Sequence, residues 1–315
     1  MKIYQSYQRL IGSDKYFRNS NEHVQVTGEK ASELLRKKLL EDAPLMVTRF
    51  GANELNCILN FVFINTGIVG NFGNIIKGMP YFFSLKKGVV AGMNIGAGFF
   101  PADKKSIERY CLLSLDDLSA IDVLGSWVAQ EQFLFDRFDP NHTRIQLEDL
   151  SPFDHVHPWS GALAGKKVLV VHPFEDTIRV QYQKRQHLFR NQEILPEFEL
   201  KTIKAVQSIA NSETPYKTWF EALDAMTDQI AKTDFDIALL GCGAYGMPLA
   251  ARIKRMGKKA VHIGGATQCF FGIKGKRWEI PFYNYQNKYY NSYWVRPGEN
   301  DTPKNAGKVE DGCYW

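Results

Sequence analysis

Buried-strand and helical patterns alternate through the second half of the chain, and this alternation restricts the possible folds more than any other feature. Apolar runs predict strands over residues 167–174, 199–206, 235–240 and 258–265. Amphipathic spacing predicts helices over residues 247–256 and 214–232, the latter with Pro215 in its first turn. Strands that are separated by helices form parallel sheets with helices on both faces. The sequence therefore predicts an α/β fold with a Rossmann-like parallel sheet.

The first half of the chain contains a further unit of strand, turn and helix. The run LMVTRF at residues 45–50 predicts a strand that ends at Gly51, and apolar residues at helical spacing predict a helix and then a loop over residues 55–76. The same criteria predict three other features: a helix over residues 29–41, a mainly helical region over 106–138 with a strand-like piece at 120–124, and a second strand and loop over 89–98.

The chain is long enough for one large or two modest domains, since it has 315 residues. A loop rich in Pro, Gly and His, residues 151–166, is the best candidate for a boundary. We divide the chain into an N-terminal helical layer (1–44), an α/β part (45–160) and a Rossmann-like half with an aromatic C-terminal segment (161–315). The alternative is that the last two parts form one compact domain.

The charge and cysteine content of the chain indicate which kinds of ligand and which compartment to expect. The chain has 39 Lys and Arg against 34 Asp and Glu, a net charge of +5, without the clustered basic stripe of a nucleic-acid binder. This balance mildly favours anionic ligands such as phosphates, and we expect no nucleic acid. The five cysteines are widely spaced and include no CxxC pair, so we expect a reducing cytoplasm. Attachment to the inner face of the plasma membrane stays open.

A glycine-rich turn gives the strongest local motif. GCGAYG at residues 241–246 contributes Gly241, Gly243, Tyr245 and Gly246 between a predicted strand and a predicted helix. Such glycines let the backbone approach a phosphate, and the helix N-terminus favours its charge. A dinucleotide site also needs an acidic residue at the end of the next strand, but this strand ends in His262. An NAD-dependent oxidoreductase is therefore disfavoured, while another nucleotide, a sugar phosphate or a simple packing turn stays open.

A second motif, RFGANE, closes the first predicted strand. It contributes Arg49, Gly51, Asn53 and Glu54 at the carboxyl end of the strand, where ligands of open parallel sheets bind. Arginine suits a diphosphate through bidentate contacts, and glutamate can ligate a divalent ion or orient a hydroxyl. The alternative is a salt bridge between Arg49 and Glu54.

Two further groups of polar residues follow predicted strands. His172 comes directly after a buried strand, so a neutral imidazole there can act as a base or contact a phosphate. Beyond the last strand, Thr267 and Gln268 are followed by the cations Lys276 and Arg277, which would neutralise a pyrophosphate leaving group. The aromatic residues after position 280 can stack on a sugar or base, or pack the C-terminal segment onto the core.

These motifs resemble those of bacterial glycosyltransferases with the GT-D type of fold, which act in the assembly of surface polysaccharides and glycoproteins. The signature R-F-G-D-G-E-L of that family is matched by Arg49-Phe50-Gly51-Ala52-Asn53-Glu54-Leu55. The segment DIALLGCGAYGMPLAARIKRMGKKAVHIGG is similar to the strand, glycine turn, helix and strand of the family's nucleotide site. The two segments bound a region of roughly two thirds of the chain.

The resemblance implies a nucleotide-sugar donor, a UDP-sugar first of all, and a saccharide or lipid-linked glycan acceptor. It also implies a divalent metal, Mn²⁺ or Mg²⁺, held by the two carboxylates of the signature. Here the first of these positions is Ala52, and only Glu54 remains. Either Glu54 holds the metal with other ligands, or Arg49, Lys276 and Arg277 neutralise the leaving group instead. Glu54 is the expected catalytic residue, with His172 as a second candidate for the base.

Overall fold

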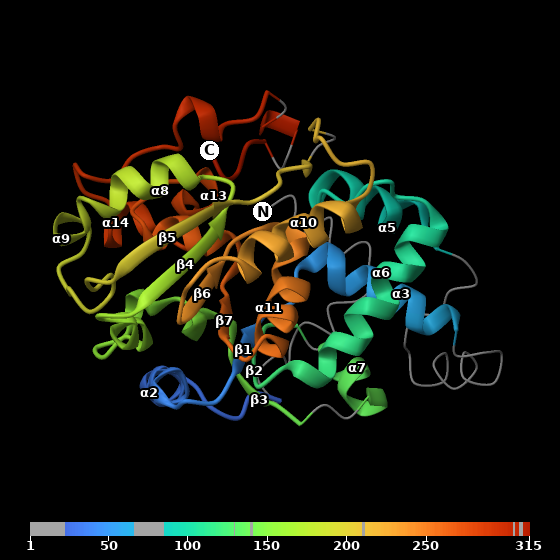
Figure 1. Cartoon of the computed structure of the whole chain (residues 1–315), viewed down its shortest axis with the longest axis horizontal. Helices are drawn as coiled ribbons and strands as arrows, with labels where there is room; N and C mark the ends of the chain where they lie inside the picture. Colours follow the sequence, from blue (N-terminus) through green and yellow to red (C-terminus); the bar gives the residue numbers. More distant parts are fainter. Residues whose placement is uncertain are drawn as a thin grey trace.

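Seven parallel strands form one sheet in the order β3-β2-β1-β7-β6-β4-β5 (Figure 1). The computed structural model describes residues 23–65, 85–128, 130–138, 141–209, 212–304, 306–308 and 311–315. The strands are β1 (Leu45–Thr48), β2 (Val123–Ser126), β3 (Thr143–Gln146), β4 (Lys167–His172), β5 (Glu199–Lys204), β6 (Ile237–Leu240) and β7 (Lys259–His262). The predicted parallel sheet is therefore confirmed.

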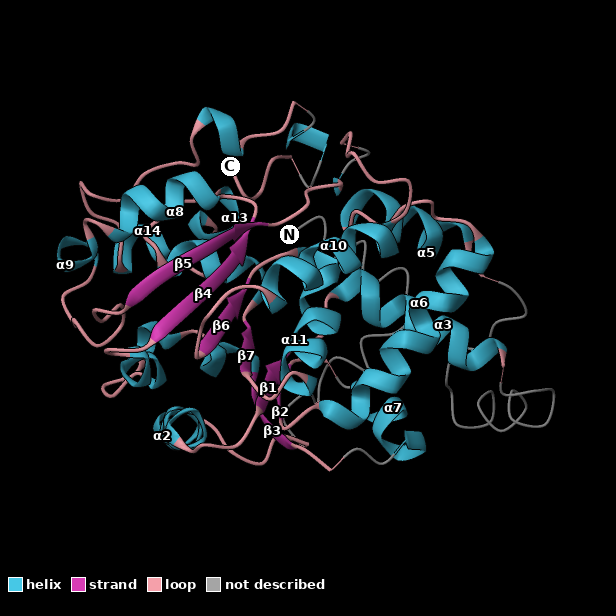
Figure 2. Cartoon of the chain, viewed as in Figure 1, coloured by secondary structure: helices cyan, strands magenta, loops and turns pink. Residues whose placement is uncertain are grey.

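Helices cover both faces of the sheet (Figure 2). One face is covered by α3 (Ala52–Ile64), α5 (Lys87–Ala91), α6 (Lys104–Asp117), α7 (Glu131–Phe138), α10 (Trp219–Ala231) and α11 (Gly246–Arg255). The other is covered by α2 (Glu29–Leu40), α8 (Glu175–Tyr182), α9 (Arg185–Leu188), α12 (Thr267–Phe270), α13 (Lys276–Glu279) and α14 (Tyr285–Lys288). The predicted two-sided α/β architecture and N-terminal helix are thus confirmed.

Side-chain alternation along the strands explains why both faces need cover. In β4, Val168 and Val170 join the hydrophobic core beneath α2 and α8, whereas Leu169 and Val171 join the core beneath α10 and α11. All four are buried. Because side chains of a strand alternate between faces, an unbroken apolar run can be stable only between two helical layers.

Two predictions of local structure are wrong. Residues 89–98 lie in α5 and in a π-helical turn, Gly92–Gly96, rather than in a strand. Its glycines leave room for the side chain of Asn53, because a Cβ at Gly92 would lie 2.8 Å from Asn53 Oδ1. Helix α10 begins at Trp219 and not near residue 214, because the Thr218 hydroxyl accepts a hydrogen bond from the Glu221 amide at 3.1 Å and caps the helix. Pro215 therefore precedes the helix.

The sequence pattern did not predict β3, in which only Ile145 is buried. The segment 151–166 connects this edge strand to β4 near the opposite edge, through the short 3-10 turns Pro152–Asp154 and Trp159–Leu163. Strands from both sides of that segment thus share one sheet. Residues 1–22 and most of the loop predicted before residue 76 lie outside the described residues. In the part of the chain that the structure describes, no helix has the length and apolar character needed to cross a membrane.

The direction of the chain connections reverses between β4 and β6. From β4 the chain proceeds outward to β5, while from β6 it proceeds in the opposite direction to β7. Helices that follow these two strands lie on opposite faces, as α8 and α11 do in Figure 1. In open parallel sheets, ligands bind at such a reversal, beyond the carboxyl ends of the strands.

Candidate functional site

The candidate site is the carboxyl edge of the sheet, which we define by the residues that end or follow five neighbouring strands. From β2 to β4 these are Ser126, Arg49, His262, Gly241 and His172. The strands pair in this order, so the RFGANE segment after β1 and the glycine turn after β6 are separated only by the end of β7. The two motifs therefore border one continuous edge.

The Arg49 side chain lies against Gly264, the second residue after β7. A Cβ built on Gly264 would lie 3.1 Å from Nη1 and 3.4 Å from Cδ of Arg49, and Gly264 has a φ of +75°. The Nε atom of Arg49 is buried and has no hydrogen-bond partner among the described residues. Buried donors in native structures are normally paired, so this guanidinium has capacity left for a ligand.

Glu54 places a carboxylate beside Arg49. Gly51 precedes α3, and a Cβ built on it would overlap the Glu54 carboxylate, which folds back over the start of the helix. Burial raises the pKa of Glu54, while its own backbone N–H and the Arg49 charge oppose that rise. Burial also lowers the pKa of Arg49, and Glu54 counteracts it. The charges of the two groups therefore interact, but among the described residues no ion pair within 4 Å joins Arg49 and Glu54, so the salt-bridge alternative is not shown.

Glu131, which sequence reasoning missed, provides a second carboxyl group whose charge interacts with Arg49. Its carboxylate accepts hydrogen bonds from the Ser126 hydroxyl and from the Trp127 amide. Burial raises the pKa of Glu131 to about 7, and these hydrogen bonds and Arg49 limit the rise. A signal existed in the sequence: Glu131 opens a helix after a strand, as Glu54 does.

His262 connects the two motifs. Its Nδ1 lies 3.0 Å from the Thr48 hydroxyl, and its ring fills the space that a side chain at Gly246 would need. Burial, together with the charge of Arg49, lowers the pKa of His262 to about 3, so the ring is neutral. His262, which stands where a dinucleotide site would need an acidic residue, therefore packs between the start of α11 and the end of β1.

His172 and Gly241 lie at the ends of the neighbouring strands β4 and β6, and they pack against each other. A Cβ at Gly241 would lie 2.5 Å from His172 Cδ2 and 2.7 Å from Thr267 Cβ. The Phe174 amide donates to Nδ1 of His172 at 2.9 Å, and burial lowers the pKa of His172 to about 3. A neutral ring that accepts at Nδ1 carries its proton on Nε2. His172 therefore presents a donor in this arrangement.

The glycine turn brings the N-terminal end of α11 to the same edge. Gly243 has a φ of +58° and lies near the Ala97 carbonyl, with 3.9 Å between that oxygen and a built Cβ. A 3-10 turn, Gly243–Tyr245, then leads into α11 at Gly246. The partial positive charge of the helix N-terminus thus lies at the carboxyl edge, after β6.

Several predicted ligand residues instead support the edge. Tyr245 stacks on Trp219 with 4.8 Å between ring centroids and lies buried in the core. The Thr267 hydroxyl donates to the Gly264 carbonyl at 2.7 Å. The amide of Gln268 donates to the carbonyls of Lys274 and Tyr314 at 2.9 and 3.0 Å. Asn53, described above, packs against the π-helical turn.

The predicted cations lie beside the C-terminal residues. Arg277 donates from Nη1 to the Tyr314 hydroxyl at 3.0 Å, and its Cζ lies 4.7 Å from the centroid of that ring. Arg277 also lowers the pKa of Arg49 through their like charges, as expected for neighbours. Lys276 is exposed and donates to the Asp311 carbonyl at 3.2 Å. Tyr314, not predicted, packs on Gly265, where a Cβ would lie 2.6 Å from its ring.

The residues at this edge do not fit a divalent metal. Ala52 has no ligand atom, and the Glu54 carboxylate lies over Gly51 and next to a cation. Within the described ranges, no group of three His, Cys, Asp or Glu residues is arranged to hold a metal ion. Arg49 and Arg277 are the cations that the edge itself supplies.

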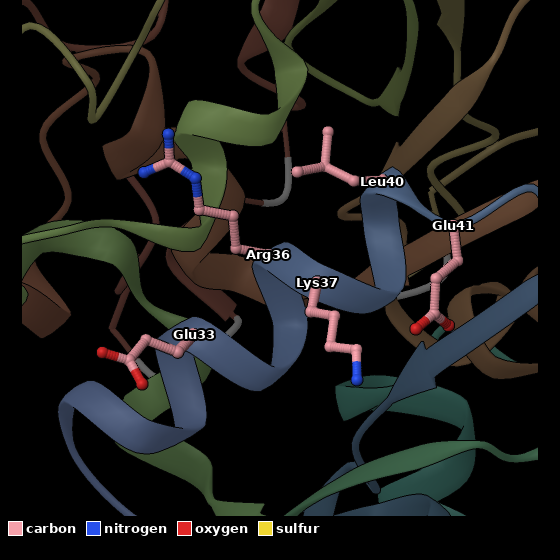
Figure 3. Close-up of a pocket in the computed structure, with 5 residues that line it drawn as sticks. All are labelled: Glu33, Arg36, Lys37, Leu40 and Glu41. Carbon is pink, nitrogen blue, oxygen red and sulfur yellow. The ribbon is translucent and has the colours of Figure 1, made fainter.

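A separate hollow lies on α2 and is lined by Glu33, Arg36, Lys37, Leu40 and Glu41 (Figure 3). The side chains diverge instead of converging on one point. The carbonyls of Leu39 and Glu41 accept hydrogen bonds from Lys259, the first residue of β7, so the hollow lies toward the amino ends of the strands. It is therefore distinct from the carboxyl edge.

Comparison of the chain with protein families, curated proteins and solved structures finds no match. The chemistry of the carboxyl edge is accordingly interpreted from its own residues.

Proposed function

We propose that the protein is a glycosyltransferase that moves a sugar from a nucleotide-diphosphate sugar to a saccharide or lipid-linked acceptor, in the assembly of a bacterial surface polysaccharide. The observation that carries the proposal is the convergence of Arg49, Glu54 and the glycine turn at one edge of a parallel sheet. The resemblance of both motifs to GT-D type enzymes supports the same function. A cytoplasmic location at the inner face of the plasma membrane would suit such a reaction.

The diphosphate binds along the carboxyl edge in this proposal. The N-terminal end of α11 faces one phosphate, His172 donates from Nε2, and the guanidinium of Arg49 faces the other phosphate. Arg277 adds a second positive charge near Arg49. As the bond to the sugar breaks, negative charge grows on the diphosphate, and fixed cations in a partly buried site stabilise it.

Glu54 is the proposed base. The acceptor hydroxyl gives its proton to the Glu54 carboxylate, and the acceptor oxygen forms a bond to the anomeric carbon of the donor. The bond from that carbon to the diphosphate oxygen breaks, and its electron pair leaves with the diphosphate. Burial raises the pKa of Glu54 above its ordinary value, which makes the carboxylate a stronger base. No step requires a metal, in keeping with the donor set described above.

Ligand-dependent thermal unfolding tests the proposal. A ligand that binds only the folded protein raises its stability by about 2.7 kcal/mol at a hundredfold excess over Kd. A panel of nucleotide sugars, with and without EDTA, should include at least one that raises Tm in both conditions. Absence of any shift would contradict the proposal, and a shift with NADH alone would favour an oxidoreductase.

A non-catalytic nucleotide-sugar binding protein is the second candidate, and the replacement of a signature carboxylate by Ala52 favours it. The two candidates differ in the fate of the donor. A transferase releases nucleoside diphosphate when acceptor extract is added, whereas a binding protein returns the donor intact.

A further inference from the structure

The inference concerns Glu131, a buried carboxyl to which the proposed mechanism assigns no role. Its residue is 1% exposed, lies in the first turn of α7, and faces the ends of β1 and β2. Carboxyl groups are rarely buried unless paired, because the loss of hydration penalises their charged form. The position of Glu131 beside Arg49 therefore requires an explanation.

A chain of contacts connects Glu131 to Arg49. The Trp127 amide donates to Glu131 Oε1 at 3.4 Å, and the Ser126 hydroxyl donates to Oε2. The indole N–H of Trp127 donates to the Phe50 carbonyl at 3.1 Å, which fixes the ring against the residue after Arg49. The Arg49 Cζ lies 5.7 Å from the centroid of that ring, within the range of a cation–π contact.

Several charged and titratable groups lie near Arg49. Glu131 on α7 and Glu54 on α3 both interact with the charge of Arg49. Arg277 on α13 and the Tyr314 ring near it also act on Arg49, and His262 on β7 stays neutral. Ser126 and Trp127, which hold Glu131, are uncharged. An anion that binds Arg49 would therefore place new negative charge near Glu131.

We infer that Glu131 is a positioning residue for Arg49, and that it takes up a proton when an anion occupies the carboxyl edge. The inference rests on the anion site of the proposed function. In the empty site, ionised Glu131 and the Trp127 ring hold the guanidinium at the end of β1. A bound anion competes for the same guanidinium, and protonation of Glu131 relieves the repulsion between the two negative charges.

Proton uptake makes anion affinity depend on pH. If one proton is bound with each anion, affinity falls by up to about tenfold for each pH unit above the pKa of the free site. Burial sets the pKa of Glu131 at about 7, so the decline belongs between pH 7 and 8.5. His172 and His262, each with a pKa of about 3, stay neutral throughout that range.

Sulfate binding at constant ionic strength tests the inference, because sulfate does not change its charge in this range. Its affinity is measured from protein fluorescence at half-unit steps from pH 6 to 8.5. In the wild type, affinity should fall by about tenfold between pH 7.5 and 8.5. In Glu131→Gln it should be nearly independent of pH. Glu108→Gln, which removes a surface carboxylate that pairs with Lys104 at 3.8 Å, is the matched control and should follow the wild type.

Trp127→Phe tests the positioning of Arg49 separately from the charge of Glu131. This variant keeps Glu131 but loses the N–H that donates to Phe50, so sulfate should bind more weakly with the same pH dependence. A wild-type affinity that does not vary with pH, a parallel decline in Glu131→Gln, or no sulfate binding would overturn the inference. Sulfate is not a sugar donor, so a pH-dependent sulfate site without any response to nucleotide sugars would refute the proposed function alone.

Discussion

The guanidinium of Arg49 lies against Gly264, so the residue that ends β1 is fixed by the backbone that follows β7. A Cβ at position 264 would lie 3.1 Å from Nη1, so a side chain there would press on the guanidinium. This contact joins the RFGANE segment to the segment that follows β7, although the two are far apart in the chain.

Gly264→Ala should impair ligand binding more than folding. Its φ of +75° is unfavourable for alanine, and the new Cβ would lie 3.1 Å from Arg49 Nη1. Gly257 has a φ of +79° with no atom within 4 Å of a built Cβ, so Gly257→Ala carries the same backbone cost of about 1–2 kcal/mol without the contact. Titration of both variants should show sulfate affinity reduced by about tenfold or more in Gly264→Ala only. Equal affinities would refute the contact.

Arg49→Lys should weaken binding of a diphosphate by roughly tenfold to a hundredfold, because hydrogen bonds to a charged group contribute about 1.5–3 kcal/mol and lysine cannot form the bidentate contact. Isothermal titration with the nucleotide sugar that raises Tm provides the measurement. Arg36→Lys is the control, since Arg36 forms an exposed salt bridge with Glu193 at 2.9 Å on α2. It should leave the affinity unchanged.

His172→Asn tests the donor at the end of β4. The asparagine carbonyl can still accept from the Phe174 amide, so the fold should be kept, while the Nε2 donor is lost. Diphosphate affinity should fall by roughly tenfold.

His172→Asn should also change how stability varies with pH. In urea unfolding at acidic pH, the variant should lose less free energy of unfolding than the wild type. The native pKa of His172 is about 3, below the ordinary 6.5, so its contribution to stability is lost as pH falls from 6.5 toward 3. Identical acid profiles would contradict this account.

Glu131→Gln should change how stability varies with pH. The native pKa of Glu131 is about 7, above the ordinary 4.5, so the wild type binds more protons folded than unfolded and loses stability as pH rises from 4.5 through 7. Glutamine removes this loss, which amounts to roughly 2–4 kcal/mol when complete. Urea unfolding at pH 5 and pH 8 should therefore show the variant gaining stability relative to the wild type at the higher pH. A constant difference between the two proteins would count against a buried, titrating carboxyl.

Local patterns were sufficient to predict the parallel sheet, and topology explains why. Apolar runs such as residues 168–171 are stable only between two helical layers, so these runs by themselves predict a sheet with helices on both faces. The prediction of a strand at residues 89–98 is wrong because the apolar residues of this run fit a strand as well as a helix. The glycines of the run leave room for Asn53, which comes from α3, and a local pattern does not show that contact. For β3, a single buried residue left too weak a signal.

The site could be predicted only where its position follows from a strand end. Arg49 directly follows β1, His172 is the last residue of β4, and Glu54 lies in the first turn of the helix that follows β1, so all three lie near strand ends. Tyr245 lies in the same motif as the glycine turn, yet its stacking on Trp219 depends on a helix that the motif does not contain. Glu131 was missed because its chemistry arises from burial and from Arg49, which only the folded chain brings together.

Release of nucleoside diphosphate from a nucleotide sugar, measured after EDTA treatment for the wild type and for Glu54→Gln, tests the central claim most directly. The account predicts release by the wild type without metal. It also predicts a rate lower by about a hundredfold or more in Glu54→Gln, with donor affinity retained, because a general base contributes on that order. Release that requires added metal, or equal rates in the two proteins, would contradict a metal-independent transferase with Glu54 as its base.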